Sequence, residues 1–128
     1  MKNFLLLFVC LAIVGTSFSQ AKTLVFKETK HSFGKIKQNT PVTYVFAFTN
    51  AGNKPLVIES AEAECGCTTP EYPKGVIAKG ANNSLKVTYN AAAMGTFTKR
   101  VTVKMANIAE PVVLTIEGEV VANKPVKS

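Results

Sequence analysis

Apolar and polar residues alternate along most of this chain with a period of two. The clearest stretch is residues 41–50, in which two sets of side chains face opposite ways. One set is Val42, Tyr44, Phe46 and Phe48, and the other is Thr43, Val45, Ala47 and Thr49. Successive side chains of a β-strand point to opposite faces, so this pattern predicts a half-buried strand. No segment shows a sustained helical period.

Six further stretches predict strands, which gives about seven in all. They cover residues 23–27, 31–36, 56–61, 84–90, 97–105 and 112–119. Gly34 interrupts the second of these stretches, where we expect a β-bulge. Residues 50–53 predict a turn, since Asn and Gly tolerate positive φ. Residues 65–80 contain several glycines and prolines and predict a loop.

Short alternating strands separated by turns are typical of an all-β, immunoglobulin-like antiparallel sandwich, because each sheet must bury one face against the other. Period-two placement also predicts the core of this sandwich. The expected core residues are Phe33, Tyr44, Phe46, Phe48, Leu56, Ile58, Leu85, Val87, Phe97, Val101, Val103, Leu114 and Ile116.

The beginning of the chain has a different pattern. Lys2 precedes an apolar run over residues 4–14, and Ser17 and Ser19 follow in a polar stretch. The run has roughly 11 residues, too few to cross about 30 Å of hydrocarbon as a helix. A basic start, a short apolar run and small residues are the parts of a cleavable signal peptide. We therefore expect a signal peptide over residues 1–19, a sandwich domain over residues 20–121 and a polar tail over residues 122–128.

A short membrane anchor and a lipoprotein are the alternatives to cleavage after Ser19. No stop-transfer pattern follows the apolar run, which disfavours the anchor. The residues Leu7-Phe8-Val9 before Cys10 are bulky where a lipid-attachment motif has small residues. We expect Cys10 to leave with the signal peptide and the rest of the chain to be exported to the periplasm or the cell exterior.

The charge of the chain is basic but diffuse. The formal net charge is +7, there is no Asp or Trp, and Arg100 is the only arginine. Nucleic-acid sites use arginine for base contacts and cluster their basic residues, whereas these lysines are scattered and mostly alternate with apolar residues. Such lysines mark solvated strand faces and protect strand edges from aggregation. We expect no nucleic-acid partner, at most a peripheral association with membranes, and another envelope protein as the partner.

The densest chemical feature is the motif Cys65-Gly66-Cys67. In an exported protein the two cysteines can form a disulfide, and Gly66 eases the turn that this small ring requires. They can instead exchange with the thiols of a redox partner or bind a soft metal. The simplest interpretation is that they pack or bond to pin a loop at one end of the sandwich. Cys65 and Cys67 are thus the candidate thiol or disulfide site.

Counting ligands limits the metal hypothesis. A structural zinc site needs four ligands, so His31 and a glutamate would have to converge on the two cysteines from distant positions. Copper(I) is easier to accommodate, because it accepts two thiolates, with Met94 as a further soft ligand; Met105 is the other methionine among the candidate donors. No spacing in the sequence requires either metal, and we predict no metal site and no cofactor.

No set of residues predicts an enzyme. The chain has no Asp for a Ser-His-Asp triad, although Glu can substitute, and His31 is the only histidine. Glu59, Glu62 and Glu64 alternate along one extended segment, but a glycosidase pair is expected beside aromatic sugar platforms. We interpret these acids as a solvated face and predict a non-catalytic module.

With these motifs in view, the chain resembles the secreted bacterial family known as domain of unknown function 1573. The matching segments are Phe33-Gly34-Lys35-Ile36, residues 46–52, Pro55-Leu56-Val57-Ile58, Cys65-Gly66-Cys67-Thr68, Val87-Thr88-Tyr89, Gly95-Thr96-Phe97 and residues 114–118. Where the family usually has a Pro-Gly turn, this chain has Lys79-Gly80, which should change the turn and not the fold. The resemblance implies an immunoglobulin-like sandwich similar to periplasmic chaperone and sperm-protein domains, which mostly bind other proteins. It implies no reaction.

Overall fold

The computed structural model describes residues 23–122, so the expected signal peptide and most of the expected tail lie outside the described residues. This part of the chain is built from strands and contains no helix. The strands are β1 (Leu24–Phe26), β2 (Lys30–Lys37), β3 (Val42–Asn50), β4 (Leu56–Ala63), β5 (Thr68–Glu71), β6 (Val76–Ile77), β7 (Asn82–Tyr89), β8 (Gly95–Met105) and β9 (Val112–Val121). Accordingly, no helix able to cross a membrane occurs between residues 23 and 122.

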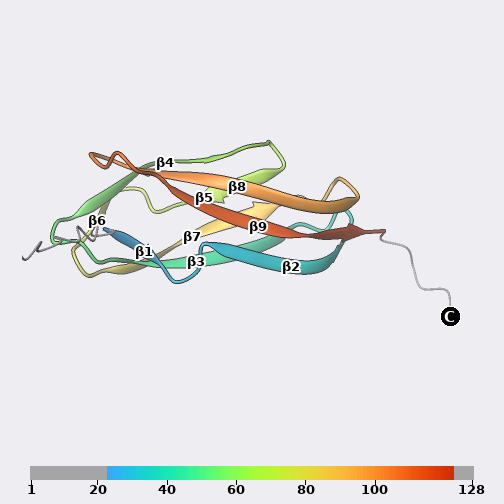
Figure 1. Cartoon of the computed structure of the whole chain (residues 1–128), viewed down its shortest axis with the longest axis horizontal. Coiled ribbons are helices and arrows are strands. Elements are labelled where there is room, and N and C mark those ends of the chain that lie inside the picture. Colours follow the sequence, from blue (N-terminus) through green and yellow to red (C-terminus); the bar gives the residue numbers. More distant parts are fainter. Residues whose placement is uncertain (1–22, 123–128) are drawn as a thin grey trace, which may run out of the picture.

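The strands form two packed sheets (Figure 1). The first has the order β1-β3-β7-β5 and the second the order β2-β9-β8-β4-β6. The inward residues of both sheets form one core, as the alternating pattern requires. The sandwich predicted from that pattern is confirmed.

Two of the nine strands lie inside the region that the sequence predicts as a loop. β5 pairs with the edge of β7, and β6 pairs with the start of β4 at Leu56 and Val57. These strands are four and two residues long, too short for alternation to reveal them, and β5 contains Pro70. Backbone pairing with a longer neighbour therefore forms strands that side-chain pattern does not indicate.

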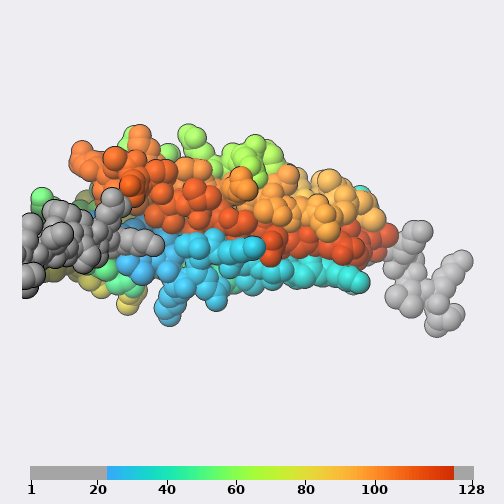
Figure 2. Space-filling model, in the orientation of Figure 1, coloured from blue at the N-terminus to red at the C-terminus, as the bar shows by residue number. Residues whose placement is uncertain are grey.

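The chain changes sheets near its beginning. β1 pairs with β3 in the first sheet, and after the crossover at residues 27–29 the chain enters β2 in the second sheet. There β2 runs parallel to β9, whereas every other pairing is antiparallel. A purely antiparallel sandwich was expected, and the crossover explains the difference. Figure 2 shows the segments of β2 and β9 side by side on one face of the molecule.

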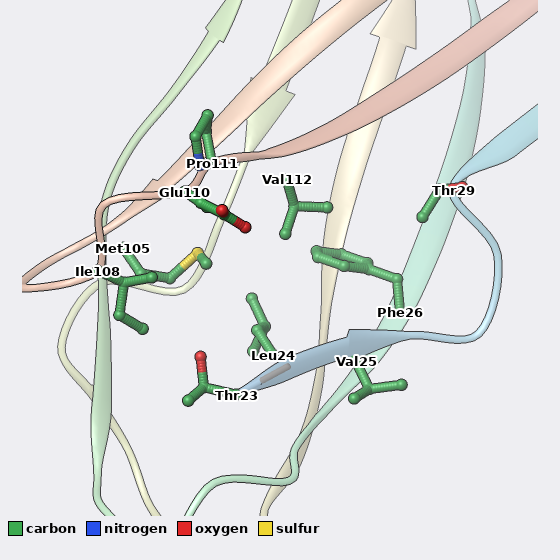
Figure 3. A pocket seen from close by; sticks show the side chains of 10 residues that line it. All are labelled: Thr23, Leu24, Val25, Phe26, Thr29, Met105, Ile108, Glu110, Pro111 and Val112. Atoms are coloured by element: carbon green, nitrogen blue, oxygen red, sulfur yellow. The ribbon is translucent and has the colours of Figure 1, made fainter. Parts of the chain in front are cut away.

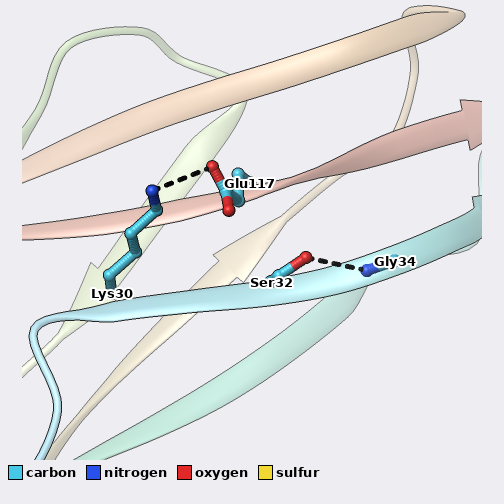
Figure 4. Close-up of polar contacts among 4 residues, drawn as sticks. All are labelled: Lys30, Ser32, Gly34 and Glu117. Atoms are coloured by element: carbon cyan, nitrogen blue, oxygen red, sulfur yellow. Dashed lines mark hydrogen bonds and ion pairs between the residues drawn. The ribbon is translucent and has the colours of Figure 1, made fainter.

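A β-bulge interrupts β2 where the sequence predicts it. The register with β9 shifts between Ser32 and Lys35, and Gly34 has a φ of 69°, which favours glycine. The Gly34 N–H donates to the Ser32 hydroxyl over 3.4 Å, and Lys30 lies 3.4 Å from the Glu117 carboxylate across the strand pair (Figure 4). These contacts hold the strand directly after the crossover.

Of the predicted core residues, all are buried except Phe33 and Tyr44, which are half-buried. The core also contains eight buried residues outside that list, namely Leu24, Phe26, Ile36, Ile77, Tyr89, Ala91, Met105 and Val120. Phe33 and Tyr44 belong to a group of four rings, the aromatic cluster, formed by His31, Phe33, Tyr44 and Phe46. His31 stacks on Tyr44 with ring centroids 3.6 Å apart, and Tyr44 meets Phe46 edge-on at 4.8 Å. Phe33 and Tyr44 lie at the side of the sandwich and not in its middle, because β2 is an edge strand and β3 has no neighbouring strand of the described chain beside Tyr44 on that side.

Asn50 was expected as a turn residue that tolerates positive φ, but it has another role. Its φ is not positive, and its side chain is fully buried at the end of β3. The amide Nδ2 donates to the carbonyls of Lys54 and Ile77 over 2.9 and 3.1 Å, and the Oδ1 accepts from Gly52 N–H over 3.1 Å. The turn at residues 50–53 is therefore fixed by side-chain hydrogen bonds.

Candidate functional site

The two cysteines of the Cys65-Gly66-Cys67 motif form a disulfide, with their Cα atoms 5.3 Å apart. The motif is the turn that carries the chain from β4 in one sheet to β5 in the other. It therefore lies outside the regular ladders, where the Gly/Pro pattern predicts it. Both cysteines are partly exposed, and Cys67 also packs against the core.

Neighbouring strands hold this turn on both sides. Asn90 N–H donates to the Cys67 carbonyl over 3.0 Å, and Arg100 N–H donates to the Glu64 carboxylate over 3.0 Å. The buried hydroxyl of Thr68 lies 3.9 Å from the Cys65 sulfur and 3.7 Å from the Cys67 sulfur. These contacts fix the position of the partly exposed disulfide.

The other candidate ligands do not gather at the disulfide. Among residues 23–122, no three His, Cys, Asp or Glu side chains are placed to hold a metal ion. His31 is stacked in the aromatic cluster, and Met105 is buried in the core. Met94 is exposed in the loop after β7, which begins with the Asn90 that contacts Cys67. After reduction of the disulfide, a copper(I) site would have the two cysteines as ligands, and Met94 stays a predicted third ligand.

The three alternating glutamates have separate surroundings in the structure. Glu59 lies 4.0 Å from the Lys104 ammonium on the neighbouring strand, and Glu64 holds the backbone of Arg100. Glu62 is exposed. Glu28, which the sequence pattern did not single out, accepts a hydrogen bond from the Tyr44 hydroxyl. This hydrogen bond, with smaller contributions from burial and from the charge of Glu28, raises the pKa of Tyr44.

The crossover leaves part of one edge of each sheet without a partner strand in the described chain. β1 pairs with β3 only from Phe48 to Asn50, so residues 42–46 form the β3 half-edge. β2 pairs with β9 only from Thr115 onward, so residues 112–114 form the β9 half-edge. Unpaired strand edges present N–H and C=O groups that can pair with another chain. Neither half-edge is evident from the alternating pattern, and the available signal is the presence of two short strands separated by only three residues.

Three other strands at the sheet edges carry features that oppose strand addition. The outer edge of β5 contains Pro70, which has no N–H to donate. β2 exposes Lys30, Lys35 and Lys37. Part of β4 is covered by β6, and the Tyr72 hydroxyl donates to the Glu59 carbonyl over 3.4 Å. The two half-edges are thus less protected than these strands.

A pocket of about 260 Å³ opens between β1 and the β8–β9 connection, beside the β9 half-edge (Figure 3). Leu24 and Phe26 point into it from β1, and Met105, Ile108 and Val112 face them from the other sheet. We call it the seam pocket, because it lies where the two sheets meet. Its full lining is Thr23, Leu24, Val25, Phe26, Thr29, Met105, Ile108, Glu110, Pro111 and Val112.

Residues 24–120 match the profile of the family described as "Protein of unknown function (DUF1573)". The chain belongs to this family. The match covers both sheets of the DUF1573 domain, together with the disulfide turn and both half-edges. Comparison of the domain with curated proteins gives no match.

Solved structures show that the DUF1573 domain has an immunoglobulin-like fold. A protein of unknown function from Porphyromonas gingivalis W83 superposes with a TM-score of 0.66 and 14% identity, over 76% of this chain and 46% of that one. The secreted serine protease VesC from Vibrio cholerae gives 0.61 and 16% identity, over 80% of this chain and 24% of that one. PapD-like domain 7 of human CEP192 gives 0.62 and 9% identity, over 80% of this chain and 87% of that one.

The match covers only part of two of these three proteins. The chain spans less than half of the P. gingivalis protein and about a quarter of VesC. At these identities the likeness concerns the fold alone.

Proposed function

We propose that this domain is a non-catalytic extracytoplasmic module that binds another protein of the cell envelope. The observation that carries the proposal is the pair of half-edges created by the crossover between β1 and β2. Strand addition at such an edge supplies main-chain hydrogen bonds, and nearby side-chain pockets supply specificity. The partly exposed Val45 and Val113 lie on these half-edges and give a partner apolar surface to cover.

Export is a separate part of the proposal, and it rests on the pattern of residues 1–19. N-terminal sequencing of the protein from the envelope fraction should give Gln20, or its cyclised form, as the first residue. Retention of Met1 in that fraction would show an anchored chain and contradict the expected processing.

Site-specific photo-crosslinking tests the binding function. A benzophenone amino acid is placed singly at Val45 or Val113, with Val76 as the control because it is even more exposed, at 71%, and lies on neither half-edge. We expect irradiation of intact cells to give one discrete adduct from a half-edge position and none from Val76. The partner, identified by mass spectrometry and purified, should bind the processed domain and be recovered with its mass unchanged. Folded variants that give no adduct at either half-edge would contradict the proposal.

A second candidate function is thiol exchange or copper(I) binding at Cys65 and Cys67. The partial exposure of this disulfide favours it, since a partner thiolate can approach at least one sulfur. In exchange with a dithiol protein, the disulfide gains two electrons and two protons to become two thiols, and the partner's two thiols become a disulfide. In copper(I) binding, the two reduced sulfurs are the ligands.

Two titrations separate the second candidate from a purely structural disulfide. If the two cysteines exchange with partner thiols in the cell, equilibration in glutathione buffers should show that the disulfide is reduced at the thiol–disulfide redox potential of the cell. Copper(I) competition on the reduced domain should show tight binding that vanishes in the double variant Cys65→Ser/Cys67→Ser. A disulfide that resists reduction, in a domain that binds no copper(I) after forced reduction, would eliminate this candidate.

A further inference from the structure

The seam pocket and the β9 half-edge together have the features of a strand-binding site. The walls of the pocket are mainly apolar side chains, together with Thr23 and Thr29, and Glu110 is the one charged residue in its lining. Its volume of about 260 Å³ exceeds that of an engineered cavity of roughly 150 Å³ that accepts benzene. The pocket can therefore hold a bulky aliphatic or aromatic side chain.

The backbone beside the pocket is oriented to receive a strand. Thr115 N–H donates to the Thr29 carbonyl over 2.7 Å, so the polar groups of Thr115 point away from β8 toward the edge. Because these directions alternate along a strand, the N–H and C=O of Val113 point to the same side. Within residues 23–122 no hydrogen bond to them is present on that side. A strand added here would place inward side chains beside Val112, at the mouth of the pocket.

The processed chain has no residues of its own that could fill the pocket from its N-terminus. If cleavage follows Ser19, only Gln20, Ala21 and Lys22 precede Thr23, which lines the pocket. None of the three has an apolar side chain larger than a methyl group. The opposite half of the seam differs, because His31 and Phe33 pack there against Tyr44. With cleavage after Ser19, a bulky apolar side chain for the seam pocket is therefore best supplied by another molecule.

We propose that the seam pocket binds one bulky apolar side chain of an extended segment of a partner protein, and that this segment pairs with β9 at residues 112–114. The inference rests on the proposed binding function and specifies its site and the chemistry of its partner. The free main-chain groups of Val113 supply register, and the pocket supplies side-chain selectivity. The carboxylate of Glu110 favours a basic residue near the apolar anchor of the partner.

The experiment selects short peptides from a random display library on the processed domain and measures their affinity. We expect the selected peptides to share a bulky apolar residue flanked by β-branched residues. Titration into ¹⁵N-labelled domain should shift the amide signals of Leu24, Phe26 and Val113 and leave those of β5 unchanged. Peptides without such a residue, or shifts confined to other strands, would overturn the proposal.

Proline substitution distinguishes the two half-edges. Val113→Pro removes an N–H that bonds nothing in the described chain, so the fold should persist while peptide binding weakens about tenfold or more. Val45→Pro is the matched control, because by the same alternation the N–H of Val45 points to the β3 half-edge. Binding that is lost with Val45→Pro and kept with Val113→Pro would refute the site.

A second variant covers the case in which proline unfolds the domain. Ile108→Trp should fill the pocket and abolish peptide binding while circular dichroism stays unchanged. Unaltered affinity in this folded variant would contradict the proposal. Two other occupants of the pocket would also contradict the proposal. A second copy of the domain would be detected by light scattering as a dimer that Ile108→Trp makes monomeric. The unprocessed N-terminus would be indicated by peptides that bind the processed domain alone, with no partner found in cells.

Binding of the crosslinked envelope partner to the wild type and to Val113→Pro distinguishes a failure of this inference from a failure of the proposed function. If the crosslinked partner binds the wild type and Val113→Pro equally, the domain is a binding module that uses another surface. If no partner is found at either half-edge, the binding function fails together with the inference.

Discussion

The two halves of the seam between the sheets are built from the same short N-terminal segment, yet they are closed to different degrees. At the β2–β3 half, the aromatic cluster bridges the sheets, with His31 and Tyr44 stacked 3.6 Å apart. At the β1–β9 half, the facing residues leave a pocket of about 260 Å³. One crossover thus gives a half sealed by rings and a half that stays open. Closure therefore depends on which side chains flank the crossover and not on the crossover itself.

The largest expected effect is the loss of packing at the closed half. Phe46→Ala removes a ring that is 1% exposed in the core and should lower the free energy of unfolding by about 3–5 kcal/mol. Phe26→Ala is the control at the open half, where the ring already borders the pocket and its removal should cost less. Urea denaturation measures both. Equal losses at the two positions would show that the halves are packed alike.

A close backbone approach beside the closed half gives the next effect. A Cβ added at Gly118 would lie 2.8 Å from the Gly34 carbonyl oxygen and 2.9 Å from the Phe97 ring. Gly118→Ala should therefore push β2 from β9 and lower the free energy of unfolding by about 1–3 kcal/mol. Gly66→Ala, where the added atom would meet nothing within 4 Å, is the control. Thermal unfolding of the two variants compares them, and unchanged stability of Gly118→Ala would mean that the approach is not a constraint.

Removal of the disulfide should have a smaller effect and should spare both halves. The Cys65–Cys67 ring closes a very short loop, so loop-closure entropy predicts a loss of only about 1–2 kcal/mol in Cys65→Ser/Cys67→Ser. Chemical denaturation measures this loss, and peptide affinity at the seam pocket should stay unchanged. A change in that affinity would show that the disulfide turn and the seam pocket are energetically coupled.

The smallest effect concerns the hydrogen bond from Tyr44 to Glu28 at the closed half. Because the folded chain raises the pKa of Tyr44 above 10.0, the associated stability is present below pH 10.0 and is lost as the pH rises through the higher folded value. The stability of the wild type should therefore fall more steeply at alkaline pH than that of Tyr44→Phe. Parallel denaturation curves from pH 8 to 11 check this, and identical slopes would contradict the role of the bond.

Alternation predicted the strands whose residues face a core on one side and solvent on the other. β3, β7, β8 and β9 follow it closely, and most of the predicted core is buried. Alternation did not predict β5 and β6, because they are short and are formed by pairing with β7 and β4. The burial of Asn50 was not predicted either, since the acceptors of its amide include the carbonyl of Ile77, which is distant in the sequence.

The candidate site also has one part that the sequence predicts and another part that it does not. The Cys65-Gly66-Cys67 motif is local, so its bonded turn at the end of the sandwich could be predicted from composition. The half-edges and the seam pocket depend on which strands become neighbours. Leu24 and Val112, which both line the pocket, are far apart in the sequence, and no local pattern places them together.

The parallel pairing of β2 with β9 also affects the time course of folding. Lys30, near the start of the described chain, pairs with Thr115, near its end. A chain that is synthesised N-terminus first cannot complete the second sheet until its last strand has followed. Contacts so distant in sequence slow folding, because the loop must close before the pairing stabilises it. Until then β2 lacks the strand it pairs with, and the nascent domain is exposed to aggregation for the whole interval between its first strand and its last.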